Sequence, residues 1–276
     1  MTGLPVPAGA STPGSRQPWP ERLSAVLGPV GPARSLGPGL WRVAAEGRDL
    51  VVKVGDGVQD EAEGLRSLGR VSGAPPVPGV VLAEPGLLVS EWVDQEPRST
   101  GHEEELGRRL ASLHRAPWPE WGGGSSWVGA CPVSPAVLPD GRSFYGARLL
   151  GLAARCGMVG AVSEVVDRLD LLLPPTAPAL VHGDLWWGNV LWGAGGRPWL
   201  IDPSVHGGHP EEDLAMLGLF GPVPERLLRA YDEVRPPENG REERVDLFRL
   251  APVLVHAALF GGGYRRQAES ILRRYA

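Results

Sequence analysis

Three polar residues in one stretch of the chain constrain its fold more than any other feature. Asp184 follows the strand-like residues 179–181, Asn189 comes five residues later, and Asp202 ends a second apolar segment after a glycine-rich turn. Asp and Asn favour loops because their side chains bond to nearby backbone, so a turn explains each one alone. Their ordered occurrence between apolar segments indicates that loops bring three oxygen donors together.

This set of donors suits phosphoryl transfer from ATP. That reaction needs a carboxylate beside the acceptor hydroxyl and oxygen ligands that hold Mg²⁺ against the phosphates. The spacing from Asp184 to Asn189 is that of the kinase catalytic loop, in which the Asp accepts a proton and the Asn binds metal. Asp202 stands in Ile-Asp-Pro where a kinase has Asp-Phe-Gly. We predict Asp184 as the base and Asn189 and Asp202 as Mg²⁺ ligands.

A lysine inside a predicted strand supplies a cation for the phosphates. Lys53 lies in the second strand of a predicted hairpin, and Glu61 lies on the helix that follows. We predict that the two form an ion pair that directs the lysine at the α- and β-phosphates of ATP. The alternative is a lysine that protects an edge strand. A turn with Gly37 and Gly39 is assigned to the phosphates on position alone, because it lacks a full glycine-rich signature.

Two patterns of secondary structure divide the chain. Residues 40–93 read as two strands, a helix and another strand, whereas helical spacing of apolar residues dominates afterwards. We predict an α+β, two-lobed protein-kinase-like fold, with a small β-rich N-lobe and a larger, mainly α C-lobe. The N-terminal ATP-binding lobe is predicted at 19–93, and the catalytic and substrate-binding lobe at 94–276. Residues 1–18, rich in Gly, Pro and Ser, are predicted to be a disordered tail.

Charge and composition exclude several classes of partner. The formal net charge is −5 and the arginines are interspersed with acids, so no basic surface for nucleic acid is expected. No stretch reaches the ~20 apolar residues of a membrane span, and the N-terminus lacks the pattern of a signal peptide. We expect a cytoplasmic protein, a monomer or weak homodimer, that binds neither nucleic acid nor membrane.

Two histidines near the third polar residue raise the possibility of a different metal site. His206 and His209 are followed by Glu211, but the sequence has no helical His-Glu-x-x-His frame. Gly207 and Gly208 predict a turn between the histidines. We therefore interpret this segment as a loop.

With these residues placed, the chain resembles the fructosamine/ketosamine-3-kinase family, a relative of the aminoglycoside and choline phosphotransferases, from about residue 20 to residue 276. His-Gly-Asp at 182–184 is common to all these phosphotransferases. The features similar to ketosamine kinases in particular are Leu185-Trp186, Asp202-Pro203 and Asp213-Leu214-Ala215-Met216. The resemblance implies ATP-dependent phosphorylation of the 3-hydroxyl of a ketosamine, a fructosamine or ribulosamine. The product then decomposes and frees the amine, which is deglycation.

The resemblance also implies further site residues. Three consecutive residues, Glu91, Trp92 and Val93, would form the hinge that reads adenine through backbone groups. The residues that would contact the substrate surround the predicted base: His182, Trp186 and Trp187. Core packing is the alternative for Trp186. Trp187 stands where the family usually has a small residue, so a narrower or shifted acceptor pocket is expected.

Two other functions stay open at this point. An aminoglycoside-type or other small-hydroxyl phosphotransferase is one, and an acidic acceptor cleft would favour it, because such antibiotics are polycations. The other is a pseudokinase that binds nucleotide without turnover. The joint presence of the predicted lysine, base and metal ligands argues against the pseudokinase.

Overall fold

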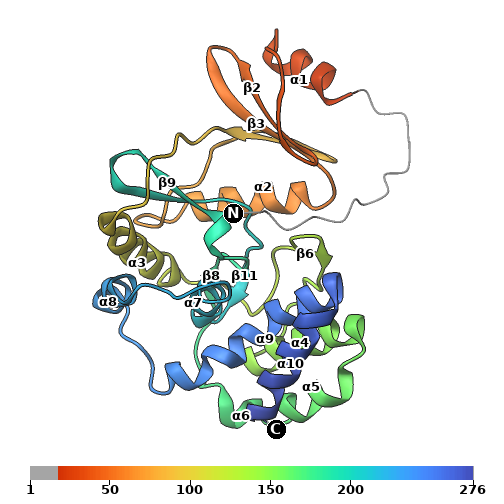
Figure 1. The fold of residues 1–276 in the computed structure, drawn as a ribbon, viewed down its shortest axis with the longest axis vertical. Helices are drawn as coiled ribbons and strands as arrows, with labels where there is room; N and C mark the ends of the chain where they lie inside the picture. The colour runs from red at the N-terminus through yellow and green to blue at the C-terminus, as the bar shows by residue number, and fades with distance from the viewer. Residues whose placement is uncertain (1–17, 276) are drawn as a thin grey trace.

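The structure is a computed structural model that describes residues 18–275, and the chain forms one part rich in β-strands and another that is mainly helical (Figure 1). The first part holds helices α1 (Trp19–Leu27) and α2 (Val58–Gly69). Its five strands form one antiparallel sheet in the order β1-β2-β3-β5-β4. These strands are β1 (Arg34–Gly37), β2 (Leu40–Ala45), β3 (Arg48–Val54), β4 (Val80–Glu84) and β5 (Leu87–Glu91). Residues 1–17 of the predicted tail lie outside the described residues.

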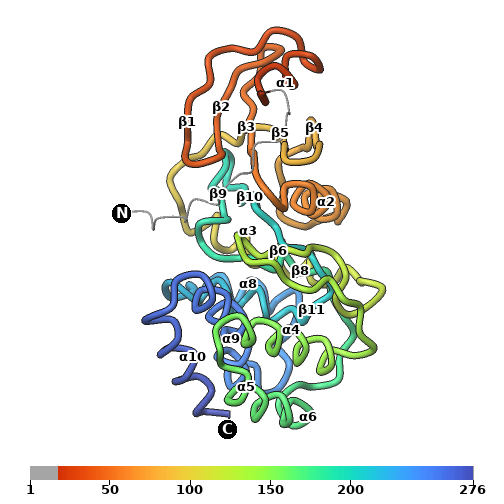
Figure 2. The backbone as a smooth tube through the Cα atoms, turned by 90° about the vertical axis from the view of Figure 1, so that its right-hand side faces the viewer, coloured from red at the N-terminus to blue at the C-terminus, as the bar shows by residue number. Residues whose placement is uncertain are grey.

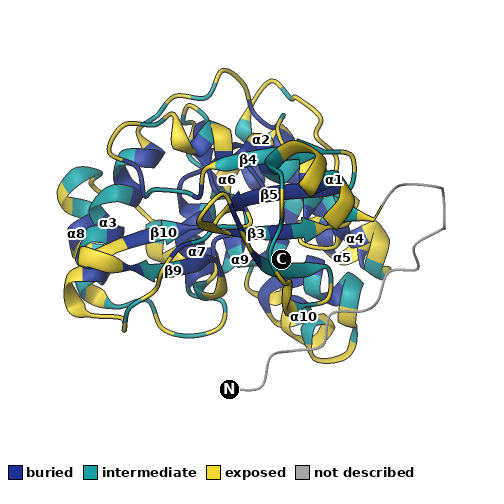
Figure 3. Ribbon diagram, turned by 90° about the horizontal axis from the view of Figure 1, so that it is seen from above, coloured by how far each residue is buried: buried dark blue, intermediate teal, exposed yellow. Residues whose placement is uncertain are grey.

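Alternation along β3 decides where its lysine points. Leu50 and Val52 are fully buried in a cluster with Leu23 of α1. Because successive side chains of a strand point to opposite faces, Lys53 lies on the other face, opposite Leu88 of β5. Leu88 packs in a second cluster with the apolar side of α2. The sheet therefore presents Lys53 toward α2, and β5 beside it is almost wholly buried (Figure 3).

The second part is built on eight helices in the described chain, which share two cores. Buried side chains of α4, α9 and α10 form one core, and those of α3 and α8 contribute to the other. The helices are α3 (Thr100–His114), α4 (Gly141–Cys156), α5 (Val159–Val166), α6 (Leu169–Leu172), α7 (Glu211–Leu217), α8 (Glu225–Val234), α9 (Arg241–Phe260) and α10 (Gly262–Tyr275). Short 3₁₀ turns occur at Trp187–Asn189 and Ala194–Gly196.

Pairs of short antiparallel strands complete this part. The pairs are β6 (Trp127–Val128) with β7 (Cys131–Pro132), β8 (Ala179–Val181) with β11 (His206–Gly208), and β9 (Val190–Gly193) with β10 (Arg197–Leu200). Hairpin β9–β10 lies between the five-stranded sheet and the helices (Figure 2).

One local prediction is wrong at β11. Gly207 and Gly208 belong to this strand, not to a turn. A Cβ atom at Gly207 would lie 2.0 Å from the carbonyl oxygen of Glu120. Glycine therefore serves here to let the strand approach a neighbouring segment closely.

The predicted α+β class is confirmed, with a smaller β-rich lobe and a larger, mainly helical lobe. The lobe boundary at residue 93 stays a prediction, although the last strand of the sheet ends at Glu91. Within the described chain, no helix combines the length and the hydropathy that a membrane span requires.

Candidate active site

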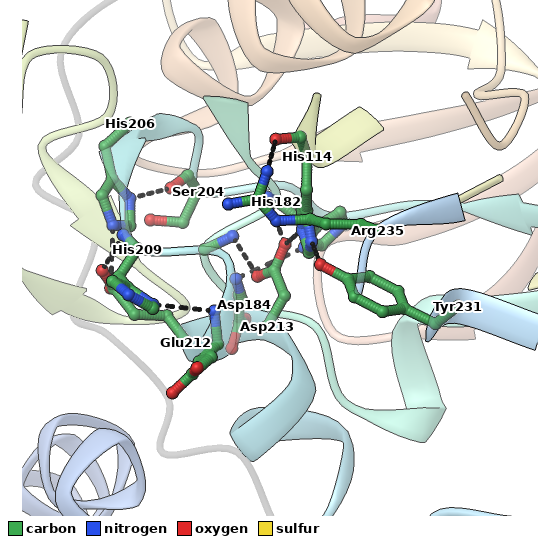
Figure 4. Close-up of polar contacts among 12 residues, drawn as sticks. His114, His182, Asp184, Ser204, His206, His209, Glu212, Asp213, Tyr231 and Arg235 are labelled. Atoms are coloured by element: carbon green, nitrogen blue, oxygen red, sulfur yellow. Dashed lines mark hydrogen bonds and ion pairs between the residues drawn. The ribbon is translucent and has the colours of Figure 1, made fainter. Parts of the chain in front are cut away.

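The loop that follows β8 is fixed by the carboxylate of Asp213 on α7. The backbone N–H of His182 donates to Asp213 Oδ2 (2.7 Å), and that of Gly183 donates to Oδ1 (2.9 Å). Gly183 has a φ of +80°, and a Cβ atom there would lie 2.1 Å from the carbonyl oxygen of Ser204, so glycine is required. Asp213 Oδ2 also lies 3.0 Å from Nε2 of His114 (Figure 4). The backbone just before the predicted base is therefore held rigidly.

Asp184 and Asn189 meet across this loop. Asn189 Nδ2 donates to the backbone oxygen of Asp184 at 2.8 Å and lies 3.4 Å from its carboxylate Oδ2. Asn189 is buried, whereas Asp184 is partly exposed. Burial, and after it the charge of Asp202, raises the pKa of Asp184 to about 7. Asn189 uses its amide nitrogen on Asp184, so its amide oxygen is the atom that can bind a cation.

The lysine of β3 joins the two lobes at this point. Lys53 Nζ lies 2.6 Å from Oε2 of Glu61 on α2 and 3.0 Å from Oδ1 of Asp202. Burial acts to lower the pKa of Lys53, but the charges of Asp202 and Glu61 outweigh burial and raise the pKa. Burial also acts to raise the pKa of Asp202, and Lys53 holds that pKa below its ordinary value. The predicted ion pair of Lys53 with Glu61 is present, and Asp202 joins it.

The turn with Gly37 and Gly39 packs against Val54, the last residue of β3. Gly39 has a φ of +67°, and a Cβ atom there would lie 2.6 Å from the carbonyl oxygen of Val54. The N–H of Val54 donates to the carbonyl oxygen of Gly39 at 2.8 Å. Gly37 lies at the irregular end of the β1–β2 pairing. The turn therefore lies one residue from Lys53 along the sheet.

The predicted hinge residues differ in how their backbone is used. The N–H of Glu91 donates to Gly79 (3.0 Å), and that of Trp92 donates to Asp49 (3.2 Å). Val93 is buried, and its N–H makes no backbone hydrogen bond in the part of the chain that the structure describes. Of the three amides, that of Val93 is the one available to a ligand.

The two tryptophans after the predicted base have different surroundings. Trp186 is 38% exposed, and its ring meets that of Phe220 edge-on with centroids 5.7 Å apart. The Trp187 ring packs on Trp192 with centroids 6.1 Å apart, and the guanidinium of Arg98 lies 4.4 Å from its centroid. Contacts within the protein therefore account for Trp187, whereas Trp186 is open to a ligand. Substrate contact by Trp187 stays a prediction.

His182 does not occupy the position that a substrate contact needs. Its side chain has no exposed surface, and its Nε2 lies 3.0 Å from the carbonyl oxygen of Ile201. Burial lowers the pKa of His182. The ring ties the loop to the segment that carries Asp202, and the prediction that His182 touches substrate is wrong.

A buried network behind the loop has no clear signal in the sequence. His114 Nδ1 lies 2.8 Å from the hydroxyl of Tyr231, and Glu212 Oε2 lies 3.2 Å from Nε2 of His206 (Figure 4). Glu212 Oε1 accepts the N–H of His209 at 2.7 Å. Acidic residues are common at the start of a helix, because their negative charge is stabilised by the positive end of the helix dipole. This explanation needs no burial, so the acids alone give no sign that they are buried. The apolar run Leu-Ala-Met directly after them is the feature that could have indicated it.

Comparisons with known proteins agree with this geometry. The family model described as fructosamine kinase matches residues 48–276. A probable ketoamine kinase of Synechocystis sp. is 35% identical over 203 residues, which cover 68% of this chain and 66% of that protein. A chloroplastic protein-ribulosamine 3-kinase of Arabidopsis thaliana is 34% identical over 201 residues, or 68% of this chain and 61% of that protein. The match thus spans just under two thirds of the length of these two relatives.

Solved structures confirm the protein-kinase-like fold. A crystal structure from Thermobifida fusca, provisionally described as a fructosamine-3-kinase, has a TM-score of 0.84 and 36% sequence identity, and the match covers 93% of this chain and 97% of that one. An aminoglycoside phosphotransferase in complex with streptomycin and ATP has a TM-score of 0.62 over 92% of this chain and 94% of that one. At 18% identity, the second likeness shows the fold alone. By its sequence and its structure, the chain belongs to the fructosamine kinase family.

Proposed function

We propose that this protein transfers the γ-phosphate of ATP to the 3-hydroxyl of a ketosamine, either a fructosamine or a ribulosamine. The observation that carries the proposal is the pairing of Asp184 and Asn189 on one loop, together with the contact of Lys53 on the sheet with Asp202. The names of the relatives, ketoamine kinase and protein-ribulosamine 3-kinase, agree with it. The phosphorylated product would then decompose and release the amine, so the activity is a deglycation.

The sheet would bind the nucleotide. Lys53, held by Glu61, would contact the α- and β-phosphates, and the backbone at Gly37 and Gly39 would cover them. The free amide of Val93 suits a hydrogen bond to adenine, because the amides of its two neighbours are already used. Of the three predicted hinge residues, only Val93 would then donate a backbone hydrogen bond to adenine.

The residues at the loop also fit Mg²⁺. The amide oxygen of Asn189 and the carboxylate of Asp202 are hard oxygen ligands of the kind that Mg²⁺ accepts together with phosphates. Asp202 holds a left-handed φ of +54°, a strained conformation of the sort that occurs at functional sites, and 47% of its side chain is exposed. When bound, Mg²⁺ would neutralise charge on the phosphates.

Asp184 would act on the acceptor. Its carboxylate would take the proton of the 3-hydroxyl while that oxygen forms a bond to the γ-phosphorus, and the bond from phosphorus to the β-phosphate oxygen would break to release ADP. Asn189 would orient the carboxylate through its amide nitrogen. The exposed ring of Trp186 would form one wall of the acceptor site, since an amphipathic ring packs well on a sugar.

The test is ATP turnover by the purified protein with a synthetic ribulosamine or fructosamine. Asp184→Asn should lower kcat by about 10²–10⁴-fold, because it removes the general base. Asp170→Asn, at an exposed position on α6, is the matched control and should keep full activity. Nucleotide binding without turnover of any acceptor would instead support a pseudokinase, and turnover of an aminoglycoside alone would support that other class. The cytoplasmic location and the monomer or weak homodimer stay predictions.

A further inference from the structure

A small cavity adjoins the catalytic loop, and an arginine of α4 lines it. The cavity reaches Gly183, the residue before the proposed base, and is bordered by Arg148, Glu212 and Phe248. Its volume of about 30 Å³ is room for about two water-sized groups, so it can take oxygens of a carboxylate or a phosphate but not a sugar ring.

Both acids beside this cavity already have partners. Glu212 accepts the N–H of His209 through Oε1 and lies against His206 through Oε2. Asp213 accepts the two backbone amides of the loop with its two oxygens. Neither carboxylate therefore has an oxygen free of protein contacts.

The side chain of Arg148, unlike these two acids, has no hydrogen-bonding partner in the described part of the chain. Within residues 18–275, Arg148 forms no ion pair and no side-chain hydrogen bond, and its guanidinium lies 5.8 Å from the ring centroid of Phe144. Burial lowers the pKa of Arg148, while the charge of Glu212 acts to raise it. A guanidinium stays charged in proteins. Within the described residues, no nitrogen of Arg148 is among the buried atoms that lack a partner, so its N–H donors are open to solvent and can meet an anionic ligand.

The planar shape of the Arg148 guanidinium limits which groups can bind it. A guanidinium presents a planar set of N–H donors that matches a carboxylate or a phosphate with two parallel hydrogen bonds. Arg148 lines the cavity together with Gly183, the residue before Asp184, and the charge of Asp184 acts on the pKa of Arg148. An acceptor whose hydroxyl lies at Asp184 therefore has its substituents within reach of this cavity. A polycationic antibiotic would instead bring an ammonium group toward the guanidinium, which disfavours the aminoglycoside alternative.

We infer that Arg148 binds an anionic group of the acceptor and so sets the substrate class: a ketosamine that carries a carboxylate on its amine part or a phosphate on its sugar. The inference rests on the proposed function. Arg148 is a specificity residue in this scheme and takes no part in the transfer of the phosphoryl group.

Three test substrates distinguish an anion on the amine from an anion on the sugar. The first is the ribulosamine of glycine, which has a carboxylate on the amine, and the second is the ribulosamine of glycinamide, of nearly the same size without that charge. The third is the 5-phosphate of the glycinamide adduct, which carries its anion on the sugar. We expect the wild-type protein to favour one of the two anionic acceptors over the neutral one by on the order of tenfold in kcat/KM, chiefly through KM, since a charge-assisted hydrogen bond is worth that much.

Variants of α4 provide the controls. Arg148→Gln should remove the preference, so that the anionic acceptors fall to the kcat/KM of the neutral one, whereas Arg148→Lys should keep part of the preference because it keeps the charge. Arg155→Gln changes an exposed arginine two turns further along the same helix and should alter nothing. The rise in Tm caused by each acceptor gives the same comparison without turnover.

The outcomes are distinct. A preference for the glycine adduct that Arg148→Gln abolishes places the anion on the amine, and the same result with the phosphate places it on the sugar. Equal kcat/KM values for all three acceptors, or an equal loss for all of them in Arg148→Gln, would overturn the inference and leave Arg148 as a residue that only balances the charge of Glu212. If no ketosamine is turned over, the proposed function fails, and the acceptor-dependent Tm shifts still decide whether Arg148 binds an anion.

Discussion

At the scale of the residue, one buried carboxylate determines the shape of the catalytic loop. Asp213 accepts two consecutive backbone amides, those of His182 and Gly183, and its Oδ2 also meets the ring of His114. Burial acts to raise the pKa of Asp213, but the hydrogen bond and charge of His114 outweigh burial and lower it. The carboxylate therefore stays ionised and holds the loop by charge-assisted hydrogen bonds.

Asp213→Asn tests this role. An amide has one acceptor oxygen and would turn its NH₂ toward a backbone N–H, so one buried donor loses its partner. We expect the free energy of unfolding, measured by urea titration, to fall by about 3 kcal/mol and kcat to fall with it. Asp170→Asn serves as the surface control. Unchanged stability of Asp213→Asn would show that the loop holds its shape without the carboxylate.

A second residue makes stability depend on pH. His209 is 5% exposed and stacks on Phe248 with ring centroids 4.8 Å apart, and its Nδ1 accepts the N–H of Glu211. No partner for its Nε2 occurs among the described residues. Burial lowers the pKa of His209 to about 3, although Glu212 acts against burial. The folded state therefore resists protonation of this ring.

Protonation of His209 should destabilise the folded protein at low pH. An unfolded histidine titrates near 6.5 and a folded His209 near 3, so the unfolded state binds the extra proton between these pH values. Stability is complete above pH 6.5 and should fall by up to ~1.4 kcal/mol per pH unit below it. His209→Gln should show a shallower fall between pH 6.5 and 4 in urea unfolding. Identical slopes in the two proteins would show that other groups cause the acid sensitivity.

These residues also show what the sequence could predict. Lys53 and Glu61 are eight residues apart, on a strand and the next helix, so periodicity alone places them near one another. Asp213 meets partners that lie 31 and 99 residues away, and His209, between β11 and α7, stacks on Phe248 of α9. Such contacts depend on tertiary packing, which local patterns do not encode.

At the scale of the element, helices α3 and α8 are in close contact at a glycine. A Cβ atom on Gly107 would lie 2.3 Å from the carbonyl oxygen of Leu227 and 3.0 Å from the amide nitrogen of Tyr231. Backbone atoms cannot move aside as a flexible side chain can. The glycine therefore sets the distance between the two helices, which carry His114 and Tyr231 of the buried network.

Gly107→Ala should destabilise the protein by ~1–3 kcal/mol, because overpacking outweighs the better helix propensity of alanine. Gly151→Ala is the matched change on α4, where a Cβ atom would meet nothing within 4 Å, and it should stabilise the protein by ~0.5–1 kcal/mol. The two Tm values should thus move in opposite directions. A rise in Tm for Gly107→Ala would mean that the helices separate at little cost.

Prediction of elements succeeded where the pattern is long and failed where it is short. The run from Arg241 to Phe260 has the apolar spacing of a helix, and the structure has one helix there despite Pro252. Strands β8 and β11 have three residues each, and their pairing joins segments 25 residues apart through His206 and Val181. Two glycines in β11 match a turn locally, and only the partner strand shows that they are extended.

At the scale of the whole molecule, contacts distant in sequence hold the lobes together at the site. Lys53 of the sheet reaches Asp202, 149 residues away. Asp60 of α2 accepts from both the N–H (2.8 Å) and the hydroxyl (2.6 Å) of Ser126, in the segment before β6. The sequence predicts two lobes from the change in periodicity, but their relative placement depends on these contacts. The proposed nucleotide site is bordered by both lobes, because Lys53 and Val93 belong to one side and Asn189 to the other.

Nucleotide binding across this boundary should therefore stabilise the molecule as a whole. A ligand that binds only the folded state at one hundred times its Kd contributes ~2.7 kcal/mol, which corresponds to about 5 °C in Tm for a chain of this size. We expect ATP with Mg²⁺ to produce this rise, and EDTA to reduce it, since Asn189 and Asp202 would hold the nucleotide through the metal. Lys53→Met should lose most of the rise, whereas Arg155→Gln should keep it. A rise that EDTA leaves intact would show binding that does not use the proposed metal ligands, and no rise at saturating ATP would contradict the nucleotide site itself.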